Sequence, residues 1–300
     1  MVNLLRIALL LTLVTVLAID LGWALGGRNG IIVASCLACL LNLGLYGASG
    51  SIVLQMHRAL PLTEDEAPEV FEIVQQLAEE AGIPIPRLYL LPSASANIFA
   101  AGRGPGHAAI AVTHGLVGLL NQEELAGVLG HEVSHILTRD ILLASAVAVL
   151  VGVLSRVASI FRGSFSWGGE RDARDHDNPL PVLFFAVLMP FVAILIRLAI
   201  PISREWRADE GGARLCGNAL YLASALRKID AFSGRFPLRD AAPATAHLFI
   251  TNPLPSQGWL RFFNSHPSLE ERMARLEGMN PCEFPKKAMV AEPTHFNAWF

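Results

Sequence analysis

The chain has 300 residues, enough for one catalytic domain of ordinary size and an additional element. Apolar residues make up 53% of it and charged residues 16%, whereas soluble domains have roughly 45–50% and about 25%. The mean hydropathy is +0.45 and the net charge is −3. No basic stripe indicates nucleic acid as a partner, and the apolar excess indicates long hydrophobic runs.

Two apolar runs lie close to the N-terminus, at residues 7–25 and 31–54. Each is long enough to cross a hydrocarbon core, which requires about 20 helical residues. The first run could be a signal peptide, but no clear A-x-A cleavage site follows it, and the second run begins after only a short break at 26–30. We therefore predict a helical hairpin of two membrane spans within residues 1–56.

Two later runs predict a second transmembrane pair within residues 141–202, joined by a polar surface loop at 162–178. The run 141–161 is interrupted by Arg156, so a buried core helix is an alternative to a complete span. The run 180–202 is uncharged over most of its length, and membrane helices tolerate its internal proline. These runs predict about four transmembrane helices in total.

The remaining residues form two polar blocks, 57–140 and 203–280, followed by a proline-containing tail at 281–300 for which we predict no regular structure. Their patterns predict a mostly α-helical fold with a small β-sheet. The predicted elements are a helix over 67–80 that Gly82 ends, strands over 87–91, 97–101 and 108–112, a helix capped by Asn121 and Glu124, and a helix that opens at Ser203 and extends toward Lys228.

The helix that follows Asn121 carries the sequence His131-Glu132-Val133-Ser134-His135. Two histidines four residues apart project from one side of a helix, about 40° apart around its axis, so both can reach one zinc ion. Glu132 can lie beside that metal without binding it and accept a proton from a zinc-bound water. The alternative is a solvated helix face with two satisfied histidines.

A catalytic zinc ion takes a third protein ligand, and Glu205 is the best candidate for it. Asp209 lies four residues later and therefore on the same helix face, where it can orient a ligand histidine through its other ring nitrogen. The alternative for Asp209 is a surface ion pair with Arg204 or Arg207. Glu205 and His131 must lie on the same side of the membrane, so zero or two spans can separate them.

These segments together resemble the HtpX family of membrane-bound zinc endopeptidases, relatives of the CAAX prenyl proteases. The resemblance extends from about Leu88 to Leu276. The matching segments are 96–100, 107–113, 124–135 with Arg139-Asp140, 203–205 with Ala208-Asp209, 248–250 with Asn252-Pro253, and His266-Pro267 with Glu271-Arg272. Trp206 departs from the usual Tyr or Phe but remains aromatic.

The resemblance implies a gluzincin-like zinc peptidase domain that holds one Zn²⁺ per chain. It implies that His131, His135 and Glu205 bind zinc and that Glu132 is the general base. It further implies that an extended substrate pairs with the strand of Asn97 and that His266 stabilises the oxyanion of the intermediate. The structural alternatives are a cap at the strand–turn junction for Asn97 and a helix N-terminal role for His266.

The same resemblance implies an endopeptidase that hydrolyses misfolded or damaged membrane proteins. It implies a multi-pass protein of the bacterial-type cytoplasmic (inner) membrane, with the active site facing the cytoplasm. Its partners would be protein substrates and the lipid bilayer, and the sequence gives no oligomeric state. The competing functions are a specific processing peptidase similar to the prenyl proteases and a non-catalytic membrane scaffold stabilised by zinc.

Overall fold

The computed structural model describes residues 2–164, 200–233, 235–236, 238, 244–253 and 266–279. Within these residues the protein is mostly helical with one small sheet, as predicted. The helices are α1 (Val2–Met56), α2 (Pro68–Ala81), α3 (His114–Leu119), α4 (Gln122–Leu137), α5 (Asp140–Ser164), α7 (Ser203–Cys216), α8 (Ala219–Ser233) and α9 (Leu269–Glu277), with short 3-10 turns at Pro105–His107 and Ala246–Leu248.

The sheet has four strands in the order β1 (Leu60–Pro61), β2 (Arg87–Leu91), β4 (Ala108–Thr113) and β3 (Ile98–Gly102). β2 and β4 are parallel, and β3 pairs antiparallel with β4, which places β3 at one edge. Its strand residues alternate between two hydrophobic clusters: Ile98 packs toward α2, α4 and α8, whereas Phe99 packs toward α1 and α5. Both faces of the sheet are therefore buried, which explains why these strands read as nearly continuous apolar runs.

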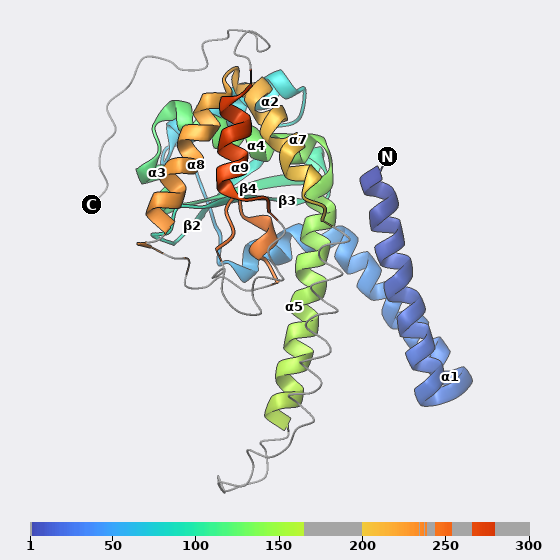
Figure 1. Ribbon diagram of the computed structural model, residues 1–300. Coiled ribbons are helices and arrows are strands. Elements are labelled where there is room, and N and C mark those ends of the chain that lie inside the picture. Colours follow the sequence, from blue (N-terminus) through green and yellow to red (C-terminus); the bar gives the residue numbers. More distant parts are fainter. Residues whose placement is uncertain are drawn as a thin grey trace, which may run out of the picture.

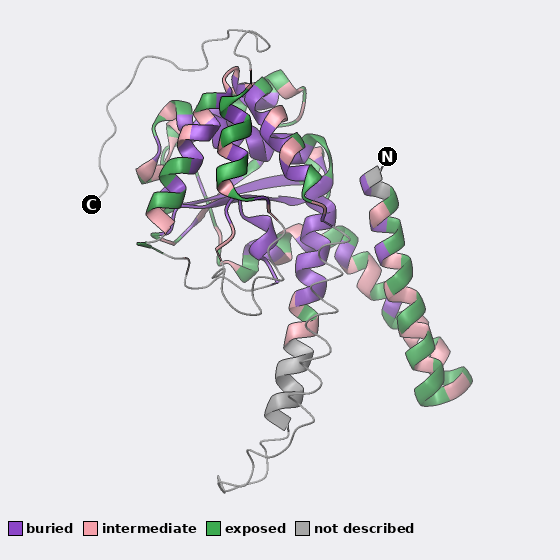
Figure 2. Cartoon of the chain, in the orientation of Figure 1, coloured by how far each residue is buried: buried purple, intermediate pink, exposed green. Residues whose placement is uncertain are grey.

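The helix α1 is a hairpin rather than a single rod, because Gly26 and Gly27 leave the helical conformation. Figure 1 shows its two arms running side by side away from the rest of the protein. A hydrogen bond of 2.8 Å from the Asn42 amide to the Thr15 hydroxyl joins them. Figure 2 shows that both arms are largely exposed, unlike the helices packed on the sheet. A helical hairpin is therefore present where it was predicted, within residues 1–56, and the crossing of a membrane by each arm stays a prediction.

Of the four membrane spans predicted, the described residues contain one or two candidates. By length and composition, one described helix, Leu5–Met56, could cross a membrane. α4 and α5 meet the same criterion only together, across a bend of 88°. The first turns of α5, up to Val151, are buried in the protein, as expected for a core helix. The predicted loop at 162–178, the run 180–202 and the tail at 281–300 lie wholly or mostly outside the described residues.

Several predicted elements are confirmed. The helix over 67–80 is α2, which Gly82 ends in the left-handed conformation. The three strands appear within one residue of their predicted bounds. The helix predicted to extend from Ser203 toward Lys228 is wrong as a single element: Gly217 adopts a left-handed conformation and divides it into α7 and α8. This break folds α8 back against α4, close to where α7 also contacts it.

Candidate metal centre

The helix α4 begins with a complete capping box and holds both motif histidines on one buried face. The Asn121 side chain accepts from the Glu124 backbone N–H, and the Glu124 carboxylate accepts from the Asn121 backbone N–H. One turn before the end of the helix, the Nε2 atoms of His131 and His135 lie 3.1 Å apart. Both side chains are buried. The two imidazoles therefore point toward each other, each with its Nε2 atom.

α7 crosses α4 at unusually close range, which brings Glu205 to the histidines. A side-chain carbon added to Gly212 would lie 2.6 Å from the backbone nitrogen of His131, so the two helices touch backbone to backbone. Glu205 precedes Gly212 by seven residues and lies on the same face of α7. Only glycine at this crossing allows the Glu205 carboxylate to reach the imidazoles.

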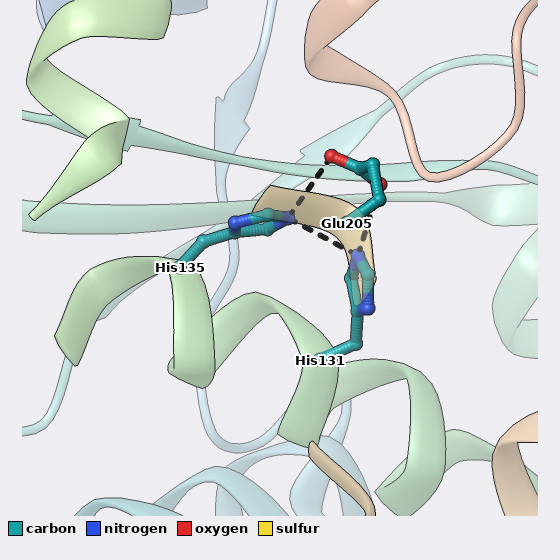
Figure 3. Close-up of side chains that lie close together, drawn as sticks. All are labelled: His131, His135 and Glu205. Atoms are coloured by element: carbon teal, nitrogen blue, oxygen red, sulfur yellow. Dashed lines mark hydrogen bonds and ion pairs between the residues drawn. The ribbon is translucent and has the colours of Figure 1, made fainter. Parts of the chain in front are cut away.

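Three donor atoms consequently point toward one another (Figure 3). The Glu205 carboxylate lies 3.7 Å from His131 Nε2 and 3.6 Å from His135 Nε2. A tetrahedral ion with bonds of about 2.0–2.2 Å separates its ligand atoms by roughly 3.3 Å. One ligand atom from each of the three side chains lies within 4.8 Å of the others. The donor set and its spacing therefore fit one metal ion.

A carboxylate lies against the other ring nitrogen of each histidine. Asp209 Oδ1 is 2.9 Å from His131 Nδ1, and Asp140 Oδ2 is 3.1 Å from His135 Nδ1. A carboxylate only accepts hydrogen bonds, so each Nδ1 carries the proton and donates it. Each Nε2 then presents its lone pair to the space beside Glu205, which is the tautomer that a metal ligand requires.

Two buried arginines hold these carboxylates in turn. The Arg272 guanidinium donates to both Asp209 oxygens, at 2.6 and 2.9 Å, and to the Ile250 carbonyl at 2.7 Å. Arg204 donates from Nε to the Glu205 carboxylate at 3.1 Å and lies 3.8 Å from Asp140. Arg272 therefore fixes the histidine–aspartate pair of His131, whereas Arg204 connects the third donor to the pair of His135.

The buried charges around the histidines do not cancel. The carboxyl groups are those of Glu132, Asp140, Glu205 and Asp209, and the guanidinium groups are those of Arg204 and Arg272. With all of them ionised, these four carboxylates and two guanidiniums leave a formal excess of two negative charges. Buried charge is costly unless it is paired. A divalent cation beside Glu205 would balance the excess.

Burial and neighbouring charges shift the pKa values of these groups in different directions. Burial, reinforced by Glu205, raises the pKa of Glu132 to about 7, although His135 and Arg204 oppose it. Burial also lowers the pKa of His131 to about 4, against the influence of Asp209. Burial alone would raise the pKa of Glu205, but His266 and Arg204 hold it well below its usual value. Glu205 is therefore ionised. The pKa of Glu132 shifts in the opposite direction, although both side chains are equally buried.

His266 lies at the same site although it comes from the segment before α9. Its Nδ1 atom is 3.1 Å from Glu205 Oε2, and its side chain is 6% exposed. The alternative for His266 was a role at the N-terminus of α9, but a different residue caps this helix. Ser268 is the residue that caps this helix, by accepting from the Glu271 backbone N–H.

Asn97 is buried and bound to the protein's own backbone. Its amide donates to the Thr251 carbonyl at 3.0 Å, and its side-chain oxygen accepts from the Ile98 N–H at 3.1 Å. The Ile250 N–H in turn donates to the Ile98 carbonyl at 3.0 Å. The segment 249–251 therefore occupies the outer edge of β3 at the position where an added strand would pair.

Comparison with known proteins assigns this arrangement to a family. The profile of peptidase family M48 matches residues 64–280, which include every side chain described above. The chain belongs to peptidase family M48. It is therefore an enzyme, a metalloendopeptidase that hydrolyses peptide bonds. This result confirms the resemblance on which the sequence interpretation rested.

Relatives of this M48 peptidase align over nearly their whole length. A protein named "Protease HtpX homolog" from Syntrophobacter fumaroxidans is 44% identical over 91% of this chain and 98% of its own. A protein of the same name from Pyrococcus abyssi is 44% identical over 90% of this chain and 94% of its own. The crystal structure of S. mikatae Ste24p aligns with 89% of this chain and 62% of its own at 17% identity, with a TM-score of 0.48, too low for an argument about the fold.

Three residues of this M48 site were not predicted from sequence as parts of it. Asp140 and Arg272 belong to segments that carried the family resemblance, but no role was assigned to either. Arg204 was considered only as a surface partner of Asp209, whereas it contacts Glu205 and Asp140 in the interior. A charged residue next to a candidate ligand, in a segment that must be buried to reach the metal, was the available signal.

Proposed function

We propose that this protein is a membrane-embedded zinc endopeptidase in which His131, His135 and Glu205 bind one Zn²⁺. The observation that carries the proposal is the convergence of these three donors beside Glu132 in a buried site. Three protein ligands are typical of catalytic zinc, whereas structural zinc sites usually have four. This count favours a catalytic over a stabilising role.

When bound, zinc would supply Lewis-acid chemistry toward a peptide carbonyl and a water molecule. Glu132 follows His131 on the same helix, so its carboxylate is offset from the ligand face by about 100° and can act beside the metal. Glu132 accepts a proton from the attacking water and delivers it to the leaving amine. The backbone of Ala100, on the strand β3 that contacts α4, lowers the pKa of this carboxylate and partly opposes the effect of burial.

Asp209 and Asp140 act through the histidines, by fixing their tautomer and ring orientation. His266 lies within reach of Glu205 and is our candidate donor to the oxyanion that forms on the substrate carbonyl. Its imidazole lies 3.1 Å from an oxygen of Glu205, a residue that would hold the metal, so it is close enough to the site to donate to a substrate carbonyl oxygen there. This role requires that His266 carry a proton on the nitrogen that faces the substrate.

Substrate is proposed to bind as an added strand along β3, with Asn97 near its backbone. The segment 249–251 now pairs with β3 there, and the Gly102 N–H donates to the Ser145 hydroxyl of α5 at 3.3 Å. An extended peptide can reach this edge only when segment 249–251 moves aside. We therefore infer that the arrangement described here is a closed one.

The exposed apolar surface of α1 supports a position in a membrane. We propose a multi-pass protein of the cytoplasmic (inner) membrane whose metal centre faces the cytoplasm, with misfolded or damaged membrane proteins as its substrates. About four spans would be completed by α5 and the run 180–202. The relatives named as HtpX proteases support this assignment over a specific processing peptidase.

The decisive experiment compares the purified wild type with Glu132→Gln in detergent. Both proteins are measured for zinc content and for cleavage of casein. We expect one zinc per chain in both and a loss of cleavage of about 10²–10⁴-fold in the variant, the usual contribution of a general base. Glu123→Gln, in the first turn of α4, is the matched control and retains activity. Equal cleavage by wild type and Glu132→Gln would overturn the assignment of the base.

A further inference from the structure

A cavity of about 160 Å³ lies outside the metal centre, where the second arm of α1 meets the sheet. One wall is the helical stretch with Gly47, Gly50 and Ser51, and the other is formed by the start of β2 and the turn between β3 and β4. Neither wall contains a residue of the proposed catalytic site. The cavity is therefore a separate feature of the fold.

Small residues on α1 create this space. A side-chain carbon on Gly50 would lie 2.7 Å from the Cα atom of Gly102, so the helix rests directly on the end of β3. One turn earlier, a side-chain carbon on Gly47 would meet no atom within 4 Å. The helix is thus anchored at Gly50 and leaves open space beside Gly47 and Ser51.

The polar wall of the cavity is positively charged. Arg87, Arg103 and His107 line it, and none of its lining residues is acidic. The Arg103 guanidinium lies 2.6 Å from His107 Nε2, so it donates to the ring nitrogen and is held along the turn. This contact leaves the charge of Arg103 without a carboxylate.

Some described arginines form ion pairs with carboxylates, and others, such as Arg28, Arg58 and Arg207, do not. Arg204, Arg214, Arg227 and Arg272 each form such a pair. No described carboxylate lies within ion-pair distance of Arg87 or Arg103. Guanidinium groups bind phosphate oxygens through paired N–H donors. Two of them on one cavity therefore indicate a phosphate-bearing anion.

The position of the cavity along α1 indicates the source of that phosphate. Exposed large apolar side chains recur along the second arm up to Tyr46, which is 52% exposed, and after it only Met56 is exposed among the large apolar residues of this arm. Gly30 to Tyr46 spans sixteen helical steps, about 24 Å, which is comparable to a hydrocarbon core of about 30 Å. Tyrosine is common where a membrane helix reaches the headgroups. The cavity begins at the next residue, Gly47; this step rests on the proposed membrane position of α1.

We propose that this cavity binds the phosphate of an anionic phospholipid headgroup, with Arg87 and Arg103 as its cationic ligands. The bound headgroup bridges the second arm of α1 and the β3–β4 turn. It would therefore fasten the hairpin to the sheet whose edge strand lies beside the catalytic helix. The ligand class is a phosphodiester with a net negative charge, as in phosphatidylglycerol.

The test measures binding to the full-length protein in a non-ionic detergent by native mass spectrometry and by the shift in thermal unfolding temperature. Three probes are used separately: short-chain phosphatidylglycerol, short-chain phosphatidylcholine and inorganic phosphate. We expect retention of phosphatidylglycerol with an upward shift, and at least about tenfold weaker binding in the Arg87→Gln/Arg103→Gln variant, since each lost charge-assisted contact weakens binding severalfold or more.

Two further variants separate the site from general charge and from misfolding. Arg28→Gln removes an exposed cation at the opposite end of the hairpin and should bind phosphatidylglycerol as the wild type does. Ser51→Phe retains both arginines but fills the cavity, and should weaken binding. Equal binding by wild type and the double arginine variant would overturn the proposal.

Binding of inorganic phosphate without a preference for phosphatidylglycerol would overturn the lipid source and assign the cavity to free phosphate. Equal binding of phosphatidylcholine would show that net charge is not recognised, which also contradicts the proposal. Both readouts are independent of casein cleavage and zinc content. A failure here is therefore distinguishable from a failure of the proposed peptidase activity.

Discussion

The N-terminal hairpin and the metal centre distribute polarity in opposite ways. In the hairpin, large apolar side chains lie on the outside, with Leu25 81% and Trp23 66% exposed. In the metal centre, charged side chains lie inside, with Glu205 and Asp209 each 1% exposed and Arg272 fully buried. Both arrangements are unfavourable for a protein in water. Large apolar patches are rarely exposed on soluble proteins, and burying a charged group is costly unless it is paired.

The difference shows that the two regions are stabilised by different means. The hairpin packs against α5 and the sheet but leaves most of its large apolar side chains exposed, so it relies on close contacts at small residues and on its surroundings. The metal centre relies on pairing: except for Glu132, each buried charge that surrounds the histidines lies against an opposite charge or a ring nitrogen. Removing one member of such a pair should therefore cost far more than a comparable change in the hairpin.

The largest effect is expected from Glu205→Gln. The amide keeps the shape of the side chain but removes the negative charge and the anionic oxygen that faces both Nε2 atoms. Zinc affinity should fall by more than the roughly 10–100-fold that loss of an outer hydrogen-bond partner costs. The measurement is zinc content after dialysis against a chelator of graded strength, together with casein cleavage.

The control for this variant is Glu210→Gln on the same helix. Glu210 forms an exposed ion pair with Arg214, away from the histidines. Its variant should retain zinc and activity. Full zinc content in Glu205→Gln would exclude this carboxylate as a metal ligand and reopen the identity of the third donor.

Arg272→Met should produce the next largest effect, on folding rather than on chemistry. The fully buried guanidinium neutralises Asp209 and also satisfies the Ile250 carbonyl. Its removal leaves a buried carboxylate unpaired, which typically costs about 3–5 kcal/mol. Denaturant unfolding monitored in the same detergent measures the change in free energy of unfolding.

Arg214→Met is the matched comparison, because Arg214 also pairs with a carboxylate, but it does so at the surface and through a single guanidinium nitrogen. Exposed pairs contribute about 0–1 kcal/mol. If both arginine variants lost the same free energy of unfolding, the distinction between buried and exposed pairing in this protein would be wrong.

Sequence alone predicted the parts of the protein that depend on periodicity and spacing. The two histidines four residues apart, the capping box at Asn121 and Glu124, and the strand over 87–91 all follow from local rules. These features need no knowledge of which segments meet in space. The hairpin turn at Gly26 and Gly27 likewise falls within the break between two apolar runs.

The remainder depends on contacts between distant segments. Asp140 and Arg204 contact each other and the site only because α5 turns sharply after Arg139, whose φ of 57° lies in the left-handed region. The covering of β3 by segment 249–251 joins residues about 150 positions apart. The position of Arg204 beside a candidate ligand was a signal of burial, but the general tendency of arginine to be exposed argued against it.

Asp140→Asn tests the support behind the second histidine. The amide can still accept a hydrogen bond, but it carries no charge to hold the His135 tautomer or to pair with Arg204. Zinc affinity should fall by about 10–100-fold, with activity restored by excess zinc. Asp230→Asn, an exposed change on α8, should have no effect. Activity that stays low when zinc is saturating would indicate a role in catalysis rather than in positioning.

The smallest effect is expected in the hairpin itself, from Gly30→Ala. A side-chain carbon at Gly30 would collide with the backbone carbonyl of Gly22 on the other arm, so the arms must separate near the bend. Overpacking costs about 1–3 kcal/mol in a closed core, and the exposed bend can yield, which places the expected loss at the low end of that range.

Gly26→Ala is the control for this change, because a carbon there meets nothing within 4 Å and its φ of −146° suits any residue. Thermal unfolding of both variants in detergent measures the difference. A loss for Gly30→Ala as large as that for Arg272→Met would show that the hairpin is held as tightly as the metal centre. The hairpin and the metal centre would then differ in where their polar and apolar side chains lie, but not in how much packing contributes to the stability of each.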